Sequence, residues 1–166
     1  NAGFIPDDSW IQDIEIGGGR VIGEVCHFID LASYFTSSLV DKVCMSSMGS
    51  DSNKNSDNVS LLLKYKNGSN VSINYYSNGS KSYSKERIEV YSQNRTIIID
   101  NWKKMYGYGF NNFKTMSQSQ NKGQFNQFKL LLDSHKDGKP QIIPFNEIIN
   151  TTKTTFSAIK SLTKNQ

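Results

Sequence analysis

The feature that most constrains the fold is a two-residue hydrophobic period in the middle of the chain. It covers residues 59–76 and is interrupted by the dipeptide Asn67-Gly68. The apolar positions of its second half, each separated by one polar residue, are Val71, Ile73 and Tyr75. Such alternation predicts strands with one buried and one polar face, and Asn-Gly is typical of a type I′ hairpin turn. We therefore expect an antiparallel hairpin here.

Further strands follow this hairpin along the chain. Residues 86–108 are rich in β-branched and aromatic side chains and predict two or three strands, which turn at Gln93-Asn94 and again near Asp100-Asn101. The polar segment 50–58 contains no residue type that needs burial and predicts an exposed loop. The centre of the chain is therefore expected to be mostly antiparallel β-sheet.

Helical periodicity brackets these strands. A helix is predicted from Glu24 to about Ser37, with a buried apolar stripe of Val25, Phe28, Ile29, Ala32 and Phe35. A second predicted helix ends at Gly138 and Pro140, and its stripe comprises Phe125, Phe128, Leu131, Leu132 and His135. A third begins after Pro144, with a stripe of Phe145, Ile149, Thr152, Phe156 and Ile159. This order indicates an α+β fold: a mostly antiparallel β-sheet of about five to seven strands with helices packed on one face.

Composition excludes several classes of protein. A chain of 166 residues fits one domain, so we expect residues 1–166 to form a single domain. No apolar run approaches the roughly 18 residues of a membrane span, and the net charge of +4 comes from scattered lysines. We therefore expect neither a membrane nor a nucleic-acid partner. Cys26 and Cys44 form no CxxC pair and no secretory signal is visible, which favours a cytoplasmic protein.

Three glycines, Gly17–Gly19, and Arg20 directly precede the first predicted helix. Backbone N–H groups at a helix N-terminus can bind phosphate, and Arg20 adds positive charge. The spacing does not match G-x-G-x-x-G, because Ile22 stands where the third glycine belongs, and no Gly-Lys-Ser/Thr follows. The alternative is a sharp turn whose glycines allow close backbone approach. The residues alone leave a tight turn and a catalytic corner both open.

His27 is the candidate catalytic residue of this corner. Glu24 and Asp30 flank it at helical spacing, and an imidazole so placed suits proton transfer near neutral pH. The alternative is a surface or hydrogen-bonded structural histidine. We expect no metal site, since Cys26 and His27 are adjacent and point to different sides of the helix.

Three segments together resemble a known family. They are "NAGFIPDDSW", "EIGGGRVIGEVCHFIDL" and "SHKDGKPQIIPFNEII", and the likeness extends from Asn1 to about Leu162. They are similar to the C-terminal domain of the Gfo/Idh/MocA family of nicotinamide-dependent oxidoreductases. The family's usual motif is G-G-G-x-x-x-D-x-G-x-H-x-x-D, and here the three glycines, His27 and Asp30 match it. The segment "GGGRVIGEVCHFID" is similar to that of a bacterial subgroup often linked to sugar or cell-surface polysaccharide metabolism.

Two positions depart from the family pattern. Gly23 stands where the family usually has aspartate, and Val25 stands where it has glycine. An acid, Glu24, appears one place later. This departure bears on the acid–base scheme and on the substrate.

The resemblance also implies that the cofactor and the substrate are bound by different domains. Family members carry an N-terminal Rossmann domain with a glycine-rich motif that this chain lacks, so we expect a fragment: the substrate-binding and dimerisation half. NAD or NADP would be bound mainly by the absent domain, with none expected in this fragment. The substrate would be a sugar-like small molecule lying between the two domains, and a homodimer would form through the sheet.

The resemblance suggests roles for single residues. His27 would accept the hydroxyl proton, Glu24 would hold the imidazole tautomer or bind a sugar hydroxyl, and Arg20 would bind a substrate carboxylate or phosphate. The further residues expected at the substrate are Gly19, Gly23, Trp10 and Asn1. Two non-catalytic alternatives stay open, a dimerisation module and a carbohydrate-binding domain rich in Tyr and Asn.

Overall fold

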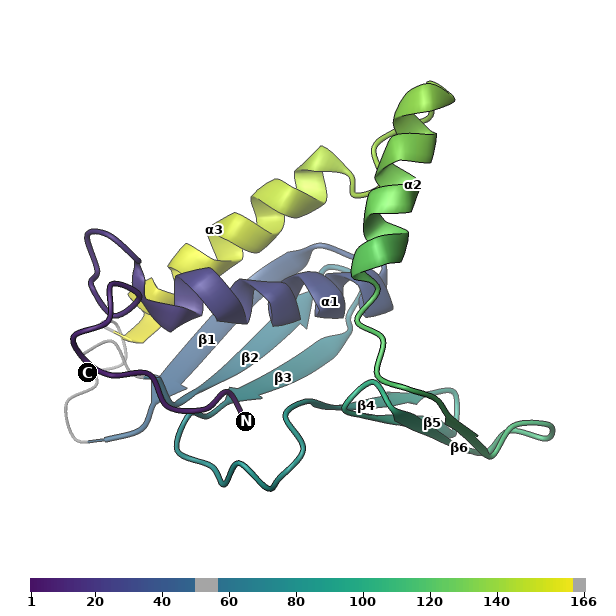
Figure 1. The fold of residues 1–166 in the computed structure, drawn as a ribbon, viewed down its shortest axis with the longest axis horizontal. Helices are drawn as coiled ribbons and strands as arrows, with labels where there is room; N and C mark the ends of the chain where they lie inside the picture. Colours follow the sequence, from purple (N-terminus) through teal and green to yellow (C-terminus); the bar gives the residue numbers. More distant parts are fainter. Residues whose placement is uncertain (50–56, 163–166) are drawn as a thin grey trace. The chain divides into compact units, whose positions relative to one another are not determined.

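The computed structural model describes residues 1–49 and 57–162 and divides the chain into two compact units (Figure 1). The three-stranded unit comprises Ala2–Asn78 and Ile143–Gln166. The four-stranded unit comprises Asn1 and Gly79–Ile142. The loop predicted at residues 50–58 lies mostly outside the described residues. The expectation of a single domain stays a prediction.

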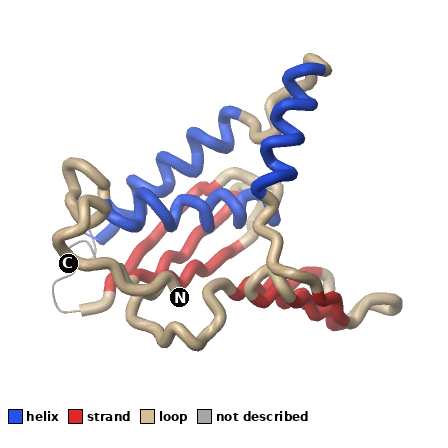
Figure 2. The backbone as a smooth tube through the Cα atoms, in the orientation of Figure 1, coloured by secondary structure: helices blue, strands red, loops and turns tan. Residues whose placement is uncertain are grey.

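The three-stranded unit is an antiparallel sheet with two helices on one of its faces (Figures 1 and 2). The strands pair in the order β1-β2-β3. Their bounds are β1 Val40–Ser47, β2 Val59–Tyr65 and β3 Asn70–Tyr75. The helices are α1 Cys26–Thr36, which follows the π-helical turn η1 Val21–Val25, and α3 Phe145–Leu162. Helix α3 packs along β1 and against α1.

The hairpin predicted at Asn67-Gly68 is confirmed, but the prediction of a type I′ turn is wrong. Strands β2 and β3 pair in register from Val59↔Tyr75 to Lys64↔Asn70. Of the two central residues only Gly68 has positive φ, +91°, whereas a type I′ turn needs positive φ at both. The Gly68 N–H donates to the Tyr65 carbonyl, as in the longer hairpin loops that end on a left-handed glycine.

The first helix buries most of the stripe predicted for it. Val25, Ile29 and Ala32 are buried, and Phe28 is partly buried against the core. Phe35 is 41% exposed, so its predicted burial is wrong.

Helix α3 also buries an unexpected face. Its buried residues are Thr151, Thr154, Thr155 and Ala158. Members of the predicted stripe are instead exposed: Phe145 by 65% and Phe156 by 55%. The small side chains allow α3 to approach β1 closely, where Asn150 and Ser161 bind strand backbone. The contact of α3 with the edge strand thus combines small side chains with hydrogen bonds to the strand backbone.

The four-stranded unit is an antiparallel meander followed by one helix. Its strands, in the order β4-β5-β6-β7, are Arg87–Ser92, Arg95–Asp100, Lys104–Tyr108 and Thr115–Ser117. The turns predicted at Gln93-Asn94 and near Asp100-Asn101 are confirmed. Helix α2 spans Gln124–Lys136 and buries none of its residues, so the apolar stripe predicted for it is exposed.

The described residues thus form an α+β fold with antiparallel strand pairing throughout, as the sequence predicts. The strands make two sheets of three and four strands rather than one. No helix in the described part of the chain is long and apolar enough to cross a membrane.

Candidate functional site

The glycine corner is a tight loop that pairs its own backbone. In Gly17–Gly19, the first two N–H groups donate to the Asp13 carbonyl at 2.8 and 3.0 Å, and the third donates to the Ile11 carbonyl at 3.1 Å. A Cβ added to Gly17 would lie 2.3 Å from the Trp10 carbonyl oxygen, so only glycine fits there. The second and third glycines have φ of 70° and 80°. The corner is therefore a close-packed turn and not a phosphate cradle.

Arg20, at the start of the helix, is buried with only 2% of its side chain exposed. Its Nε and Nη2 donate to the two Glu24 carboxylate oxygens at 3.0 and 3.3 Å. Its Nη1 donates to the Gly3 carbonyl at 2.7 Å and to Asp57 at 3.3 Å, and Nη2 donates to the Ala2 carbonyl at 3.5 Å. A guanidinium has five N–H groups, and these bonds use all of them. Arg20 therefore joins the N-terminal segment to the helix.

Tyr75 of β3 completes this arrangement, which we call the Arg20 network. Its hydroxyl donates to Glu24 at 2.6 Å, and its ring lies 5.2 Å from the Arg20 guanidinium carbon. Burial, reinforced by the hydrogen bond to Glu24, raises the pKa of Tyr75 well above its ordinary value. Gln12 donates to Asp57 at 2.8 Å. The network holds the Glu24 carboxylate in one orientation.

Burial alone would lower the pKa of Arg20, but its hydrogen bonds to Glu24 outweigh burial and raise the pKa. Arg20 is thus a permanent cation inside the fold. The prediction that it binds an anionic substrate group stays a prediction, and in this structure its donors serve the protein.

His27 is exposed on α1, as a residue that meets substrate must be. Within residues 1–49 and 57–162, no hydrogen bond or ion pair involves its side chain. Glu24 is hydrogen-bonded to Arg20 and to Tyr75. Asp30, one turn further along the helix, is half-buried. The imidazole is therefore available while the neighbouring carboxylate is fixed.

The other predicted site residues are dispersed. Gly19 is buried in the corner, and Gly23 is exposed with nothing within 4 Å of an added Cβ. Trp10 is 65% exposed on the loop before the glycines. Asn1 belongs to the four-stranded unit, where its amine donates to the Lys85 carbonyl at 3.1 Å. The structure thus gathers the helix-start residues and does not group Asn1 with them.

Sequence reasoning missed three members of the Arg20 network: Tyr75, Asp57 and Gln12. The alternation in β3 did predict that Tyr75 faces inward, and a buried tyrosine hydroxyl normally needs a partner. That requirement could have indicated a polar partner for Tyr75. No local pattern marks Asp57 or Gln12, which approach the helix only through the fold.

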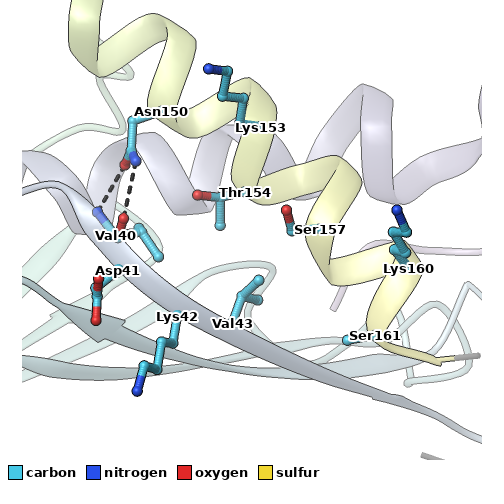
Figure 3. Close-up of a pocket in the computed structure, with 10 residues that line it drawn as sticks. All are labelled: Val40, Asp41, Lys42, Val43, Asn150, Lys153, Thr154, Ser157, Lys160 and Ser161. Carbon is cyan, nitrogen blue, oxygen red and sulfur yellow. Dashed lines mark hydrogen bonds between the residues drawn. The ribbon is translucent and has the colours of Figure 1, made fainter. Parts of the chain in front are cut away.

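A groove of about 530 Å³ lies between β1 and α3 and contains none of the predicted site residues (Figure 3). The side-chain oxygen of Asn150 accepts a hydrogen bond from the Val40 N–H at 2.8 Å. Its side-chain nitrogen donates to the Val40 carbonyl at 3.0 Å, so Asn150 pairs with the backbone of the edge strand. Figure 3 shows Lys153 and Lys160 pointing away from the strand and Lys42 pointing off its opposite side. The three ammonium groups do not converge, and the groove is not a candidate site.

The described residues contain no group of three His, Cys, Asp or Glu side chains able to hold a metal ion. The N–H groups of Gly17–Gly19 are all bonded within the corner, so they do not form a cradle for a pyrophosphate. The expectation that NAD or NADP binds mainly to another domain stays a prediction.

Comparison with known proteins decides the family. The model of the GFO/IDH/MocA C-terminal domain matches residues 2–98, which include the glycine corner, the Arg20 network, the strands from β1 to β4 and the first part of β5. The chain belongs to this family. A comparison with curated proteins finds no match.

Solved structures of several oxidoreductases share the fold. An NAD-binding oxidoreductase from Klebsiella pneumoniae has a TM-score of 0.80 at 16% identity, over 99% of this chain and 55% of its own. An aldose-aldose oxidoreductase from Caulobacter crescentus complexed with glycerol has a TM-score of 0.76 at 13% identity, over 99% and 51%. UDP-N-acetylglucosamine 3-dehydrogenase from Acidithiobacillus ferrooxidans has a TM-score of 0.75 at 14% identity, over 97% and 52%. The Gfo/Idh/MocA domain described here thus spans about half the length of these neighbours.

Proposed function

We propose that this chain is the substrate-binding half of an NAD(P)-dependent oxidoreductase that acts on a hydroxyl or carbonyl group of a sugar-like or polyol-like molecule. The carrying observation is the exposed His27, located beside a carboxylate that the Arg20 network fixes, in the corner that bears the family motif. The sugar-related names of two structural neighbours support this substrate class. The role would lie in carbohydrate or cell-surface polysaccharide metabolism in the bacterial cytoplasm. This chain alone is expected to be inactive.

His27 is proposed to accept the proton of the reacting hydroxyl, because imidazole can take up a proton near neutral pH. Glu24 has a second part in the proposal. Its carboxylate is proposed to hold the His27 tautomer or to bind a sugar hydroxyl, and 35% of its side chain is exposed. Arg20 and Tyr75 keep that carboxylate oriented. NAD or NADP, the hydride-carrying cofactor, is proposed to bind to the other half of the full-length protein.

The test is replacement of His27 in the full-length enzyme. His27→Ala is expected to lower kcat by about 10²–10⁴-fold, the usual contribution of general acid–base catalysis. Stability should change little, because the side chain is exposed and has no partner among the described residues. His27→Asn retains a hydrogen-bonding group but not the titration, so it should also be slow and should flatten the acid limb of the pH–rate profile.

UDP-N-acetylglucosamine and simple aldoses are the first substrates to assay, with NAD and NADP each supplied. Asp30→Asn is the matched control, since it changes a neighbouring acid without removing the imidazole. If both His27 variants retain near-normal turnover and an unchanged pH profile, His27 is structural and the proton acceptor lies elsewhere in the enzyme.

A homodimer formed through the sheet is part of the same proposal. Tyr91 of β4 and Tyr108 of β6 are both opposite Thr96 of β5, so they lie on one face of the four-stranded sheet. They are 71% and 57% exposed, and exposed aromatic side chains are typical of interface centres. Light scattering should show a dimer that Tyr91→Asp with Tyr108→Asp dissociates. A wild-type monomer at high concentration would argue against the dimer.

A further inference from the structure

The turn between β5 and β6 holds a tryptophan in a conformation that bulky residues rarely adopt. Asn101 and Trp102 have φ of 50° and 57°, and the Lys103 N–H donates to the Asp100 carbonyl at 2.9 Å. This is the pattern of a type I′ hairpin turn, whose second central position favours glycine. A bulky residue there is an outlier that costs free energy. The turn between β4 and β5 carries Asn94 at the same position, and asparagine tolerates it.

Hydrogen bonds fix the Trp102 indole in this turn. Its Nε1–H donates to the Glu86 carboxylate, and Lys122 donates to the other oxygen of that carboxylate at 2.6 Å. Burial alone would raise the pKa of Glu86, but the hydrogen bonds from Lys122 and Trp102 outweigh it and hold the pKa below its usual range. The side chain of Gln120 donates to the Asn101 carbonyl at 3.0 Å. A half-buried aromatic ring is thus held rigidly among polar groups.

Both hydrogen-bond donors and hydrogen-bond acceptors remain unused around the indole. A carboxylate accepts about four hydrogen bonds, so Glu86 retains about two, and the ammonium of Lys122 has donors left over. The side-chain carbonyl of Gln120 accepts no bond from the described residues. One carboxylate oxygen of Asp100, at the first position of the same turn, is buried without a partner among them, so it lies out of reach of a ligand on the surface.

These features select a ligand class by chemistry. Glu86 disfavours an anion, and Lys122 disfavours a cation. Hydroxyl groups both donate and accept, so a polyhydroxylated ring can pair with Glu86, Gln120 and Lys122 while its apolar C–H face packs against the indole. We propose that the Trp102 turn, formed by Asp100–Lys103 with Glu86, Gln120 and Lys122, is a binding platform for a sugar ring. This site goes beyond the proposed reaction, which depends on His27 in the other unit.

The test follows the indole N–H resonances of the chain by NMR during titration with glucose, galactose and N-acetylglucosamine, with adenosine as a second kind of stacking ligand. The chain has two tryptophans, so the indole of Trp10, 65% exposed, is an internal control. We expect a saturable shift of the Trp102 resonance with at least one sugar and no comparable shift of Trp10. Equal shifts at both indoles, no saturable shift, or a response to adenosine alone would overturn the proposal.

Two variants separate binding from folding. Trp102→Gly supplies the residue that the turn favours, so its melting temperature should not fall greatly, while its sugar affinity should fall about tenfold with the loss of the stacking surface. Asn94→Gly changes the same position of the neighbouring turn and should leave affinity within about twofold of wild type. Gln120→Ala leaves the indole in place and should weaken binding about fivefold, which keeps the proposal testable if Trp102→Gly does not fold. Wild-type affinity in both Trp102→Gly and Gln120→Ala would refute it.

Discussion

Replacing Arg20 by methionine tests whether the Arg20 network holds the corner together. The change preserves much of the side-chain volume but removes the guanidinium N–H groups that donate to Glu24, Asp57 and the carbonyls of Ala2 and Gly3. Removing one partner of a buried ion pair typically costs about 3–5 kcal/mol. Glu24 is 35% exposed and can recover water, whereas Asp57 is only 14% exposed. We therefore expect a loss near the lower end, about 3 kcal/mol.

For a chain of this length that loss corresponds to a fall in melting temperature of about 6–12 °C. Thermal and urea unfolding, followed by circular dichroism, would measure it. Arg20→Lys retains the charge without the fork of donors and should recover only part of the loss. In a double-mutant cycle, Glu24→Gln should reduce the cost of Arg20→Met, because the two residues share their bonds.

The matched control is Arg87→Met. Arg87 also pairs with a carboxylate, Glu89, but its side chain is 45% exposed, so little change is expected. A melting temperature for Arg20→Met within about 2 °C of wild type would refute the reasoning. The corner would then be held by backbone hydrogen bonds and apolar packing, and the orientation of Glu24 would need another cause.

Two further predictions concern stability. Gly17→Ala should lower the melting temperature, because the added Cβ would lie 2.3 Å from the Trp10 carbonyl oxygen. Gly23→Ala should be neutral or stabilising, since nothing lies within 4 Å of its added Cβ. Equal changes of the melting temperature in the two variants would contradict this. The lowered pKa of Glu86 stabilises the fold above the unfolded pKa of about 4.3, and this stability is lost as pH falls through the folded pKa. Glu86→Gln should therefore be less stable than wild type near neutral pH, with a difference that disappears in acid, and a difference independent of pH in urea unfolding would count against the Lys122 pair.

Local sequence determined the elements whose partners are close along the chain. The alternation in β2 and β3 and the turn residues between strands depend on backbone preferences within a few residues, so the hairpins and the α+β class could be predicted. The family motif identified the corner for the same reason, since Gly17–Gly19 and His27 lie within one short segment. The type of the turn at Asn67 was not determined by its dipeptide, because the loop length in the folded hairpin decides it.

Only the tertiary structure decided which faces are buried and which charges meet. Helix α1 leaves Phe35 exposed, and α3 buries a face of small residues, beside which Asn150 and Ser161 accept hydrogen bonds from the backbone of β1. The partners of Arg20 are contributed by residues 17, 18 and 37 positions away as well as by its own helix. A hydrophobic period records which side chains are apolar, but the position of a buried charge is set by donors and acceptors that converge in space, and no local pattern contains that information.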